Sequence, residues 1–376
     1  MESPFVYGKI ATEPFFTDRA KETALLVTDF QNLTNTILIS PRRWGKSSLV
    51  RMAANRAIQE DPALRICHVD IFNVRTEEEF YQKLATEILR GTASLLDEIV
   101  ANAKRFLSTV APTINIGDTM NTVGVSFQLH EIKKSEDEIL DLAEKIAVEK
   151  GIKIVVCIDE FQQIASFKNS DAFQAKLRSH WQLQQHVAYC LYGSRRHMMM
   201  EVFTNVEKPF YKFGKTMFLE KIKREHWPGF IAQRFRNTGK DITPEQCLCI
   251  VDLVDNNPYY IQQLCEEVWN RTTVKCDDET IDAAFRSIVD SQSGLNLALT
   301  QTLSITQQNL LNAIVQGEKE LTSSKVMEQY DLRNSLTVQR AKNALAKLDI
   351  IDTFGKTVSM EDPIYAFWLK NNYFRR

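Results

Sequence analysis

Residues 37–49 read Ile-Leu-Ile-Ser-Pro-Arg-Arg-Trp-Gly-Lys-Ser-Ser-Leu and constrain the fold more than any other stretch of the chain. Residues 37–39 predict the end of a buried strand, and a helical pattern begins at Ser48. Between them, residues 40–47 follow the spacing G-x-x-x-x-G-K-[ST] of a phosphate-binding loop, with Ser40 in place of the first glycine. This order predicts a cavity for phosphate oxygens, formed by backbone N–H groups and the helix N-terminus.

Individual residues of the loop have predicted roles in binding a nucleoside triphosphate. Lys46 can reach the β- and γ-phosphates, and the Ser47 hydroxyl can ligate Mg²⁺. Gly45 lets the backbone approach the phosphate. Because Pro41 restricts the residue before it to extended conformations, we expect Ser40 to have a negative φ. The predicted nucleotide-binding residues of the loop are Pro41, Arg42, Arg43, Trp44, Gly45, Lys46, Ser47 and Ser48.

A turn followed by an ordinary helix would also explain a G-K-S tripeptide, so a second motif is needed. Residues 153–158 form an apolar, β-branched run without alternation, which predicts a strand buried on both faces of a parallel sheet. The run ends in Asp159 and Glu160, at the sheet edge where ligands bind. Asp159 can complete the Mg²⁺ shell, and Glu160 can polarise the attacking water.

A third group of polar residues follows the predicted strand at residues 186–193. Ser194, directly after this strand, can contact the γ-phosphate or orient water. Arg195 and Arg196 could sense phosphate or reach a neighbouring subunit, and an exposed basic turn is the equal alternative for each. Ser194 and Glu160 are therefore the predicted catalytic residues.

Composition restricts the remaining possibilities. The chain has 376 residues, which predicts two or three domains, and its net charge of −2 gives no global basic field to attract nucleic acid. The seven cysteines show no CxxC spacing, which favours core thiols in a reducing compartment over disulfides or zinc. No apolar run reaches the roughly 18 residues of a membrane span, and no signal peptide is evident. We therefore expect a cytoplasmic protein that does not enter the membrane.

The order of elements predicts the domain organisation. Strands alternate with helices over residues 1–205, which indicates an α/β core with a three-layer parallel sheet. The first helix should begin after an N-cap at Thr17 or Asp18, and a hairpin is expected within residues 113–130. A helical domain should occupy residues 206–294, with a linker at residues 291–294 (Ser-Gln-Ser-Gly).

The last segment, residues 295–376, predicts three helices and a hairpin, the pattern of a winged helix. Its second long helix carries Arg340, Lys342 and Lys347, and Lys356 lies on the expected wing. These cations could contact DNA phosphates. The alternative, which we favour because no charge excess or aromatic interleaving is present, is a domain that packs against a partner or against the nucleotide domain.

Several segments together resemble one known family. They are Phe16-Thr17-Asp18-Arg19, the loop from Ser40 to Leu49, Ile158-Asp159-Glu160-Phe161, Gly193-Ser194, Asn256-Asn257-Pro258-Tyr259-Tyr260-Ile261-Gln262, and Asp362-Pro363-Ile364-Tyr365-Ala366-Phe367-Trp368-Leu369. In this order they look like the archaeal-type ATPase family, AAA-like P-loop proteins close to the STAND signalling ATPases. The resemblance implies a three-layer P-loop core of the ASCE type, a helical lid and a C-terminal winged helix.

The resemblance also implies roles for single residues. Asp18 and Arg19 would precede the adenine pocket, Ser194 would be the first sensor, and Pro258 would belong to the lid motif that contacts nucleotide. Lys46 and Ser47 would bind phosphate and Mg²⁺, and Asp159 and Glu160 would be the acidic pair. The chain departs from the family pattern at Ser40 and at Asn256, which replace glycines in the loop and in the lid motif.

These observations predict an ATP- and Mg²⁺-binding protein that hydrolyses ATP slowly and acts as a nucleotide-driven conformational switch. One alternative is an initiator-like DNA-binding protein that uses its winged helix. Another is a signalling or defence ATPase that recruits a protein partner or forms an oligomer.

Overall fold

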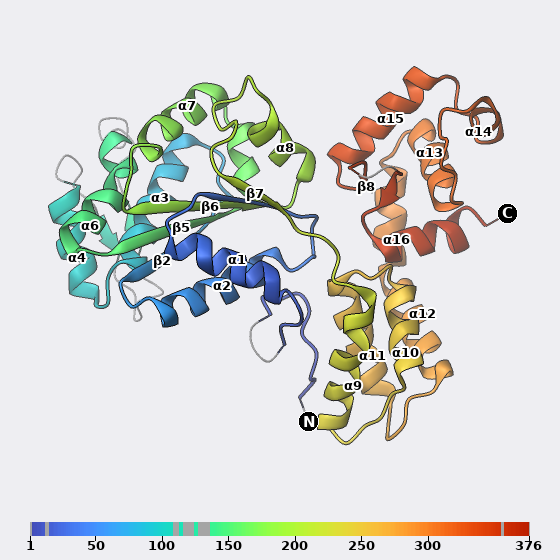
Figure 1. Cartoon of the computed structure of the whole chain (residues 1–376). Coiled ribbons are helices and arrows are strands. Elements are labelled where there is room, and N and C mark those ends of the chain that lie inside the picture. Colours follow the sequence, from blue (N-terminus) through green and yellow to red (C-terminus); the bar gives the residue numbers. More distant parts are fainter. Residues whose placement is uncertain are drawn as a thin grey trace. The chain divides into compact units, whose positions relative to one another are not determined.

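The computed structural model describes residues 2–11, 15–107, 113–115, 124–126, 136–354 and 357–375. The chain divides into two compact units, whose elements Figure 1 labels. The core unit comprises residues 19–41 and 46–220, and the helical unit comprises residues 1–18, 42–45 and 221–376. The division into three domains at residues 205 and 294 stays a prediction.

A five-stranded parallel sheet forms the centre of the core unit in the part of the chain that the structure describes. The strands follow the order β2-β5-β6-β1-β7. Their bounds are Thr36–Ile39 for β1, Leu64–Asp70 for β2, Lys153–Asp159 for β5, Val187–Gly193 for β6 and Lys215–Phe218 for β7. Because neighbouring strands are parallel, their carboxyl ends lie at one edge, where ligands bind in such sheets.

Helices cover both faces of this sheet and give the predicted three layers. Figure 1 shows α1 and α2 along one face and α3, α7 and α8 along the other. The helices of the core unit are α1 (Ala20–Gln31), α2 (Lys46–Glu60), α3 (Glu77–Gly91), α4 (Leu96–Phe106), α6 (Leu142–Lys150), α7 (Ser170–Trp181) and α8 (Arg196–Thr204), with a 3₁₀ turn η2 at Phe161–Ser166.

Strand β5 shows why its sequence has no alternation. Ile154, Val156 and Ile158 pack in the main apolar cluster of the core unit, and Val155 and Cys157 on the opposite face are also fully buried. Successive side chains point to opposite faces of a strand, so burial of both faces requires apolar residues throughout. The prediction of a doubly buried strand is confirmed.

Five of the seven cysteines are buried, as expected for core thiols, whereas Cys276 is partly buried and Cys249 is exposed. Cys67, Cys157 and Cys190 are fully buried, and all seven thiols are free. Burial is the largest cause that raises the pKa of Cys67, to about 12, so this thiol stays protonated and behaves as a small apolar side chain.

Helix α3 ends at Gly91 and α4 begins at Leu96, after the extended Leu95, so a break separates the two helices. Strand β7 pairs with β1 at the sheet edge, and its Lys215, Thr216 and Phe218 are exposed. A four-residue edge strand without a buried face has no apolar pattern to reveal it.

The predicted hairpin is confirmed for the residues that the structure describes. Strands β3 (Thr113–Asn115) and β4 (Gly124–Ser126) pair in antiparallel register, with Ile114 opposite Val125. Residues 116–123 and 127–130 of the expected hairpin lie outside the described residues.

The helical unit begins its main segment with η3 (Arg224–His226), followed by α9 (Trp227–Asn237), α10 (Pro244–Leu253), α11 (Pro258–Arg271) and α12 (Asp278–Gln301). The linker expected at residues 291–294 is wrong, because α12 runs through it without a break. The hydroxyls of Ser291 and Ser293 donate to the carbonyls of Ile288 and Val289, so both serines are accommodated within the helix. A glycine weakens a helix interior without ending it, and Gly294 is an example.

The winged-helix pattern is present at the end of the chain. Its helices are α13 (Ile305–Val315), α14 (Ser324–Gln329), α15 (Ser335–Lys347) and α16 (Pro363–Trp368), followed by a π-helical turn at Leu369–Tyr373. Strands β8 (Ile351–Asp352) and β9 (Ser359–Met360) form the antiparallel wing between α15 and α16. Lys356, the cation expected on the wing, lies outside the described residues.

Candidate nucleotide site

The phosphate loop connects β1 to α2, as its sequence predicts. Ser40 is fully buried and does not have a positive φ, in agreement with the expectation from Pro41. Left-handed backbone occurs instead at Arg43, with φ 65°, and at Gly45, with φ 84°. An added Cβ at Gly45 would meet no atom within 4 Å, so the backbone conformation and not crowding by the protein requires glycine here.

The end of the loop meets the end of β5 in the core unit. The Ser47 hydroxyl donates to an Asp159 carboxylate oxygen at 2.7 Å. The Lys46 ammonium lies 2.9 Å from Glu160 Oε1 and 3.5 Å from Asp159 Oδ1. The structure therefore brings together four side chains that the sequence assigns to phosphate, metal and water.

Ser194 completes this group from the end of the neighbouring strand β6. Its hydroxyl donates to Glu160 Oε2 at 2.9 Å, and its backbone N–H donates to the same oxygen at 3.3 Å. Strand β6 lies between β1 and β5, which explains why a residue after β6 reaches a carboxylate after β5. The proximity of Ser194 to Glu160 follows from the sheet order.

The sequence missed one residue of the group. Gln162, in the 3₁₀ turn η2, donates its side-chain amide to Glu160 Oε2 at 2.5 Å and is only 2% exposed. Glu160 itself has a left-handed backbone, with φ 57°, which is uncommon for a residue with a side chain. The position of a glutamine two residues after a predicted catalytic acid is the sequence signal that could have identified Gln162.

The two adjacent acids have pKa values shifted in opposite directions. Burial raises the pKa of Asp159 above its usual value, and the Lys46 ammonium and the Ser47 hydroxyl only partly offset this effect. Burial acts in the same direction on Glu160, but the Lys46 ammonium and the side-chain donors outweigh it and lower the pKa of Glu160. The lowered pKa favours the ionised form of Glu160, which is the form that can accept a proton.

The middle of the loop belongs to the helical unit. The Arg43 guanidinium lies 3.1 Å from Asp362 Oδ2 and donates to the Tyr260 hydroxyl at 2.5 Å. It also lies over the Tyr259 ring, 4.7 Å from its centroid. Tyr260 donates to the same Asp362 oxygen, so these residues form one polar cluster.

Arg42 and Trp44, the neighbours of Arg43, also make contacts in the same unit. Arg42 lies 3.8 Å from Asp349, and the Lys221 ammonium lies 5.9 Å from the centre of the Trp44 ring. Exposed pairs at such distances contribute little to stability.

The start of the first helix differs from the prediction. The N-cap of α1 is Arg19, without a side-chain capping bond, and not Thr17 or Asp18. Asp18 and Arg19 both have left-handed backbone, with φ 53° and 64°, whereas a capping Asp normally has extended backbone. Arg19 is almost fully buried and pairs with Glu22 at 3.0 Å, and Asp18 lies in the helical unit, 3.5 Å from His226.

The predicted lid motif begins α11 as expected. Asn257 is the N-cap and accepts from the Tyr259 N–H at 3.1 Å, and Pro258 occupies the first turn. Asn256, which replaces the family glycine, has φ 55°. Its side-chain amide donates to the Ile222 carbonyl and accepts from the Trp227 indole, each at 2.7 Å. Asparagine is among the residues that best tolerate left-handed backbone.

The other predicted residues take ordinary positions near these elements. Ser48 is buried in the first turn of α2, and Pro41 is the last residue of the first core segment. Arg195 precedes α8 and Arg196 begins it, so both lie directly after Ser194. Their assignment as phosphate sensors or as contacts to another subunit stays a prediction.

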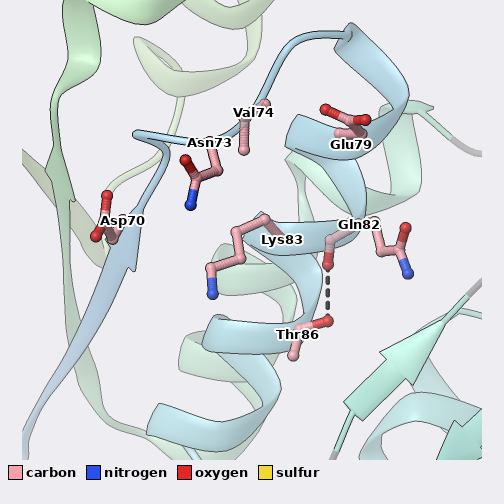
Figure 2. A pocket seen from close by; sticks show the side chains of 7 residues that line it. All are labelled: Asp70, Asn73, Val74, Glu79, Gln82, Lys83 and Thr86. Carbon is pink, nitrogen blue, oxygen red and sulfur yellow. Dashed lines mark hydrogen bonds between the residues drawn. The ribbon is translucent and has the colours of Figure 1, made fainter.

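A separate hollow of about 410 Å³ lies at the end of β2 (Figure 2). It is lined by Asp70, Asn73, Val74, Glu79, Gln82, Lys83 and Thr86. Strands β5 and β6 separate β2 from the strand that precedes the phosphate loop. None of the predicted nucleotide-binding residues lines this hollow, so it is distinct from the candidate site.

None of the helices that the structure describes combines enough length with enough apolar character to cross a bilayer.

The sequence matches two family models. A model of an ATPase domain predominantly from Archaea matches residues 16–264, and a model of a probable winged helix domain matches residues 297–371. The sequence has no significant match among curated proteins. The first model covers the phosphate loop, both acids, Ser194 and Pro258.

Solved structures share the fold over nearly the whole chain. A Walker-type ATPase of Pyrococcus abyssi is 19% identical with a TM-score of 0.70, covering 97% of this chain and 99% of that one. The ORC2 protein of Aeropyrum pernix, solved in ADPNP and ADP complexes, is 15% identical with a TM-score of 0.58, covering 96% and 94%. The ORC1 protein of Aeropyrum pernix, solved in complex with DNA, is 12% identical with a TM-score of 0.50, covering 100% and 99%.

Proposed function

Because the chain belongs to the family of ATPase domains found predominantly in Archaea, we propose that it is a Mg²⁺-dependent, slow ATPase that changes conformation with the bound nucleotide. The observation that carries this proposal is the meeting of two strand ends with the phosphate loop. Lys46 and Ser47 of the loop contact Asp159 and Glu160 of β5, and Ser194 of β6 contacts Glu160.

The residues at the end of the loop fit Mg²⁺. The Ser47 hydroxyl and the Asp159 carboxylate present two oxygens 2.7 Å apart, and Mg²⁺ prefers a few protein oxygens together with phosphate and water. When bound, the ion would neutralise charge on the phosphates. Ser47 and Asp159 are the residues that we assign to it.

Lys46 would first bind the phosphates, and Glu160 would then accept a proton from water. In this structure Lys46 pairs with Glu160 Oε1, and phosphate oxygens would compete for the same ammonium group. When Lys46 turns to the phosphates, Glu160 Oε1 becomes available to accept a proton from the attacking water. Ser194 continues to donate to Glu160 Oε2 and is placed to orient water.

The first experiment separates binding from hydrolysis. Glu160→Gln should retain ATP binding and lower ATP turnover by roughly a hundredfold or more, because a general base typically contributes about 10²–10⁴-fold. Turnover is measured as phosphate release and binding with a fluorescent ATP analogue. Unaltered turnover would remove Glu160 from this role.

Two further variants serve as a test of ATP binding and as a control. Lys46→Ala should abolish ATP binding, because it removes the cation that contacts the phosphates. Asp70→Asn is the matched control, since Asp70 ends the neighbouring strand in register with Asp159 and its side chain accepts a hydrogen bond from the Phe72 N–H. Asp70→Asn should keep both binding and turnover.

The conformational switch is supported by the Arg43 cluster. Arg43 belongs to the phosphate loop, and Tyr260 and Asp362 begin α11 and α16. Binding of phosphate to the loop would alter the setting of Arg43 and so bias those two helices. Small-angle scattering profiles should differ between the nucleotide-free protein and its ADP and non-hydrolysable ATP complexes. Identical profiles would refute the switch but leave the ATPase proposal intact.

DNA binding is a second candidate function, supported by the winged helix and by exposed cations on it. Arg340 and Lys347 of α15 are exposed, and Lys342 is half-buried. DNA binding through these residues should weaken steeply with salt, and Arg340→Ala should reduce the slope of log affinity against log salt by about 0.9. Salt-independent or undetectable DNA binding would argue against this function.

A third candidate is a signalling or defence ATPase whose winged helix recruits a protein partner or another copy. Its support is the resemblance to STAND ATPases, which stays a prediction. A pull-down with the ATP-bound Glu160→Gln variant, compared with the Lys46→Ala variant, should recover a partner only in the ATP-bound form. Recovery of the same proteins by both variants would contradict nucleotide-controlled recruitment.

A further inference from the structure

Gln162 and Glu160 form a contact that the functions above leave unexplained. The Gln162 side chain is buried, with only 2% of its surface exposed, and its Nε2 donates to Glu160 Oε2 at 2.5 Å. A carboxylate only accepts hydrogen bonds, so the amide nitrogen has to face it. The amide oxygen of Gln162 consequently points away from Glu160, and it has no hydrogen-bond partner among the described residues.

Gly193, at the end of β6, provides the space for that oxygen. A Cβ at position 193 would lie 1.8 Å from Gln162 Oε1 and 2.9 Å from Met199 Sδ. Gly193 does not have a positive φ, so its backbone conformation would accept other residues. The glycine is therefore explained by the side chain of Gln162, which occupies the place of a Cβ.

A buried amide oxygen without a hydrogen-bond partner is unfavourable, so its presence calls for an explanation. Here the amide nitrogen donates to the acid that the proposed mechanism assigns to water activation. Gly193 of β6 and the buried amide of Gln162 in η2 together allow one N–H group to donate to Glu160.

We propose that Gln162 is a positioning residue for Glu160, and that Gly193 is required because it leaves room for Gln162. The proposal rests on the assignment of Glu160 in the proposed ATPase. Lys46 contacts Oε1 of Glu160, whereas Gln162 and Ser194 contact Oε2. When phosphates draw Lys46 away, the contacts to Oε2 keep the carboxylate in place and leave Oε1 directed toward the reacting water.

The test compares Gln162→Met with Gln163→Met. Methionine has a similar length to glutamine but no hydrogen-bond donor. The neighbouring Gln163 lies in the same 3₁₀ turn. Its backbone N–H donates to the Glu160 carbonyl, and a side-chain substitution leaves this bond in place. Gln162→Met should lower kcat by between about tenfold and a hundredfold, the range expected for a misplaced catalytic group. KM and the affinity for the fluorescent ATP analogue should not change. Gln163→Met should leave kcat and KM unchanged.

A double-mutant cycle distinguishes positioning from simple packing. If Gln162 acts through Glu160, Gln162→Met should cost almost nothing further in the Glu160→Gln background, measured by single-turnover phosphate release. An equal loss of rate in both backgrounds, or a rise in KM without a fall in kcat, would overturn the proposal. Normal turnover of Glu160→Gln alone would instead refute the assignment of Glu160, which separates the two failures.

The role of Gly193 is tested in the same way. Gly193→Ala should lower kcat about as much as Gln162→Met, because the added Cβ displaces the glutamine. In the Gln162→Ala background the contact with Gln162 is absent and only the one with Met199 Sδ, at 2.9 Å, remains. Because a methionine side chain can move aside, Gly193→Ala should add little there. A full additional loss there would overturn the explanation of Gly193, and thermal unfolding of each variant verifies that it is folded. If Gly193→Ala does not fold, the Gln162 cycle decides the proposal.

Discussion

The phosphate loop and the turn before α11 each lack a glycine that the family pattern contains, but the two losses differ physically. Ser40 in the loop has no positive φ, and the left-handed positions of that loop are Arg43 and Gly45. In the turn, Asp255 and Asn256 are both left-handed, with φ 48° and 55°. A missing glycine is therefore inexpensive in the first region and demands compensation in the second.

The compensation at Asn256 is visible in its contacts. Its side chain joins the Trp227 indole to the Ile222 carbonyl, both from buried residues. The Ser40 hydroxyl instead makes a local bond, to the Pro41 carbonyl at 3.0 Å. The comparison teaches that a motif glycine can be replaced either where φ is ordinary or where the new side chain satisfies buried polar groups.

The largest effect is expected at Asn256. Asn256→Ala should lower the free energy of unfolding by about 2–4 kcal/mol, because it leaves a buried donor and acceptor unpaired and places alanine at a left-handed position. Urea unfolding measures the change. Asn256→Gly, which relieves the backbone but removes the same hydrogen bonds, should be less destabilising. A loss below about 0.5 kcal/mol for Asn256→Ala, the size of an ordinary surface change, would break the comparison.

An intermediate effect is expected at Gly45. Gly45→Ala adds a Cβ at φ 84°, at a cost of roughly 1–2 kcal/mol. If the phosphate site requires this conformation, that strain should weaken binding of the fluorescent ATP analogue by roughly tenfold, since about 1.4 kcal/mol corresponds to a factor of ten. Unchanged affinity would mean that nucleotide does not depend on the left-handed backbone at this position.

The smallest effect is expected at Ser40. Ser40→Gly restores the family residue but should not improve nucleotide affinity, because Ser40 already has an ordinary φ. The variant should lose less than about 1 kcal/mol of stability, owing to the greater freedom of glycine in the unfolded chain. A clear gain in affinity would show that the serine does impair the phosphate loop.

The sequence predicted those parts of the site that depend on local patterns. The strand-loop-helix order placed Lys46 and Ser47, and the doubly buried strand placed Asp159 and Glu160. Gln162 lies only two residues after Glu160, but it was missed because the space for its side chain, beside Gly193, is provided by β6, a strand that is close in space but not in sequence. The Arg43 cluster was missed for the same reason, since residues 43, 260 and 362 become neighbours only after folding.

Errors in the fold also have physical causes. Serine and glycine at residues 291–294 suggested a linker, but the serine hydroxyls bond within α12. Strand β7 has exposed residues and exists because β1 offers a free edge, which no pattern in its own four residues records. Asp18 resembles a helix cap by type, whereas its backbone is left-handed.

One carboxylate near the end of the chain serves two structures at once. Asp362 Oδ1 caps α16 by accepting from the Ile364 and Tyr365 N–H groups, while Oδ2 receives Arg43 and Tyr260. A movement of the Arg43 side chain would therefore act on Asp362 and, through it, on the first turn of α16. The fluorescence of a label attached near residue 370 should change when nucleotide binds to the loop. This change should be lost in Arg43→Ala, while the helix cap stays intact.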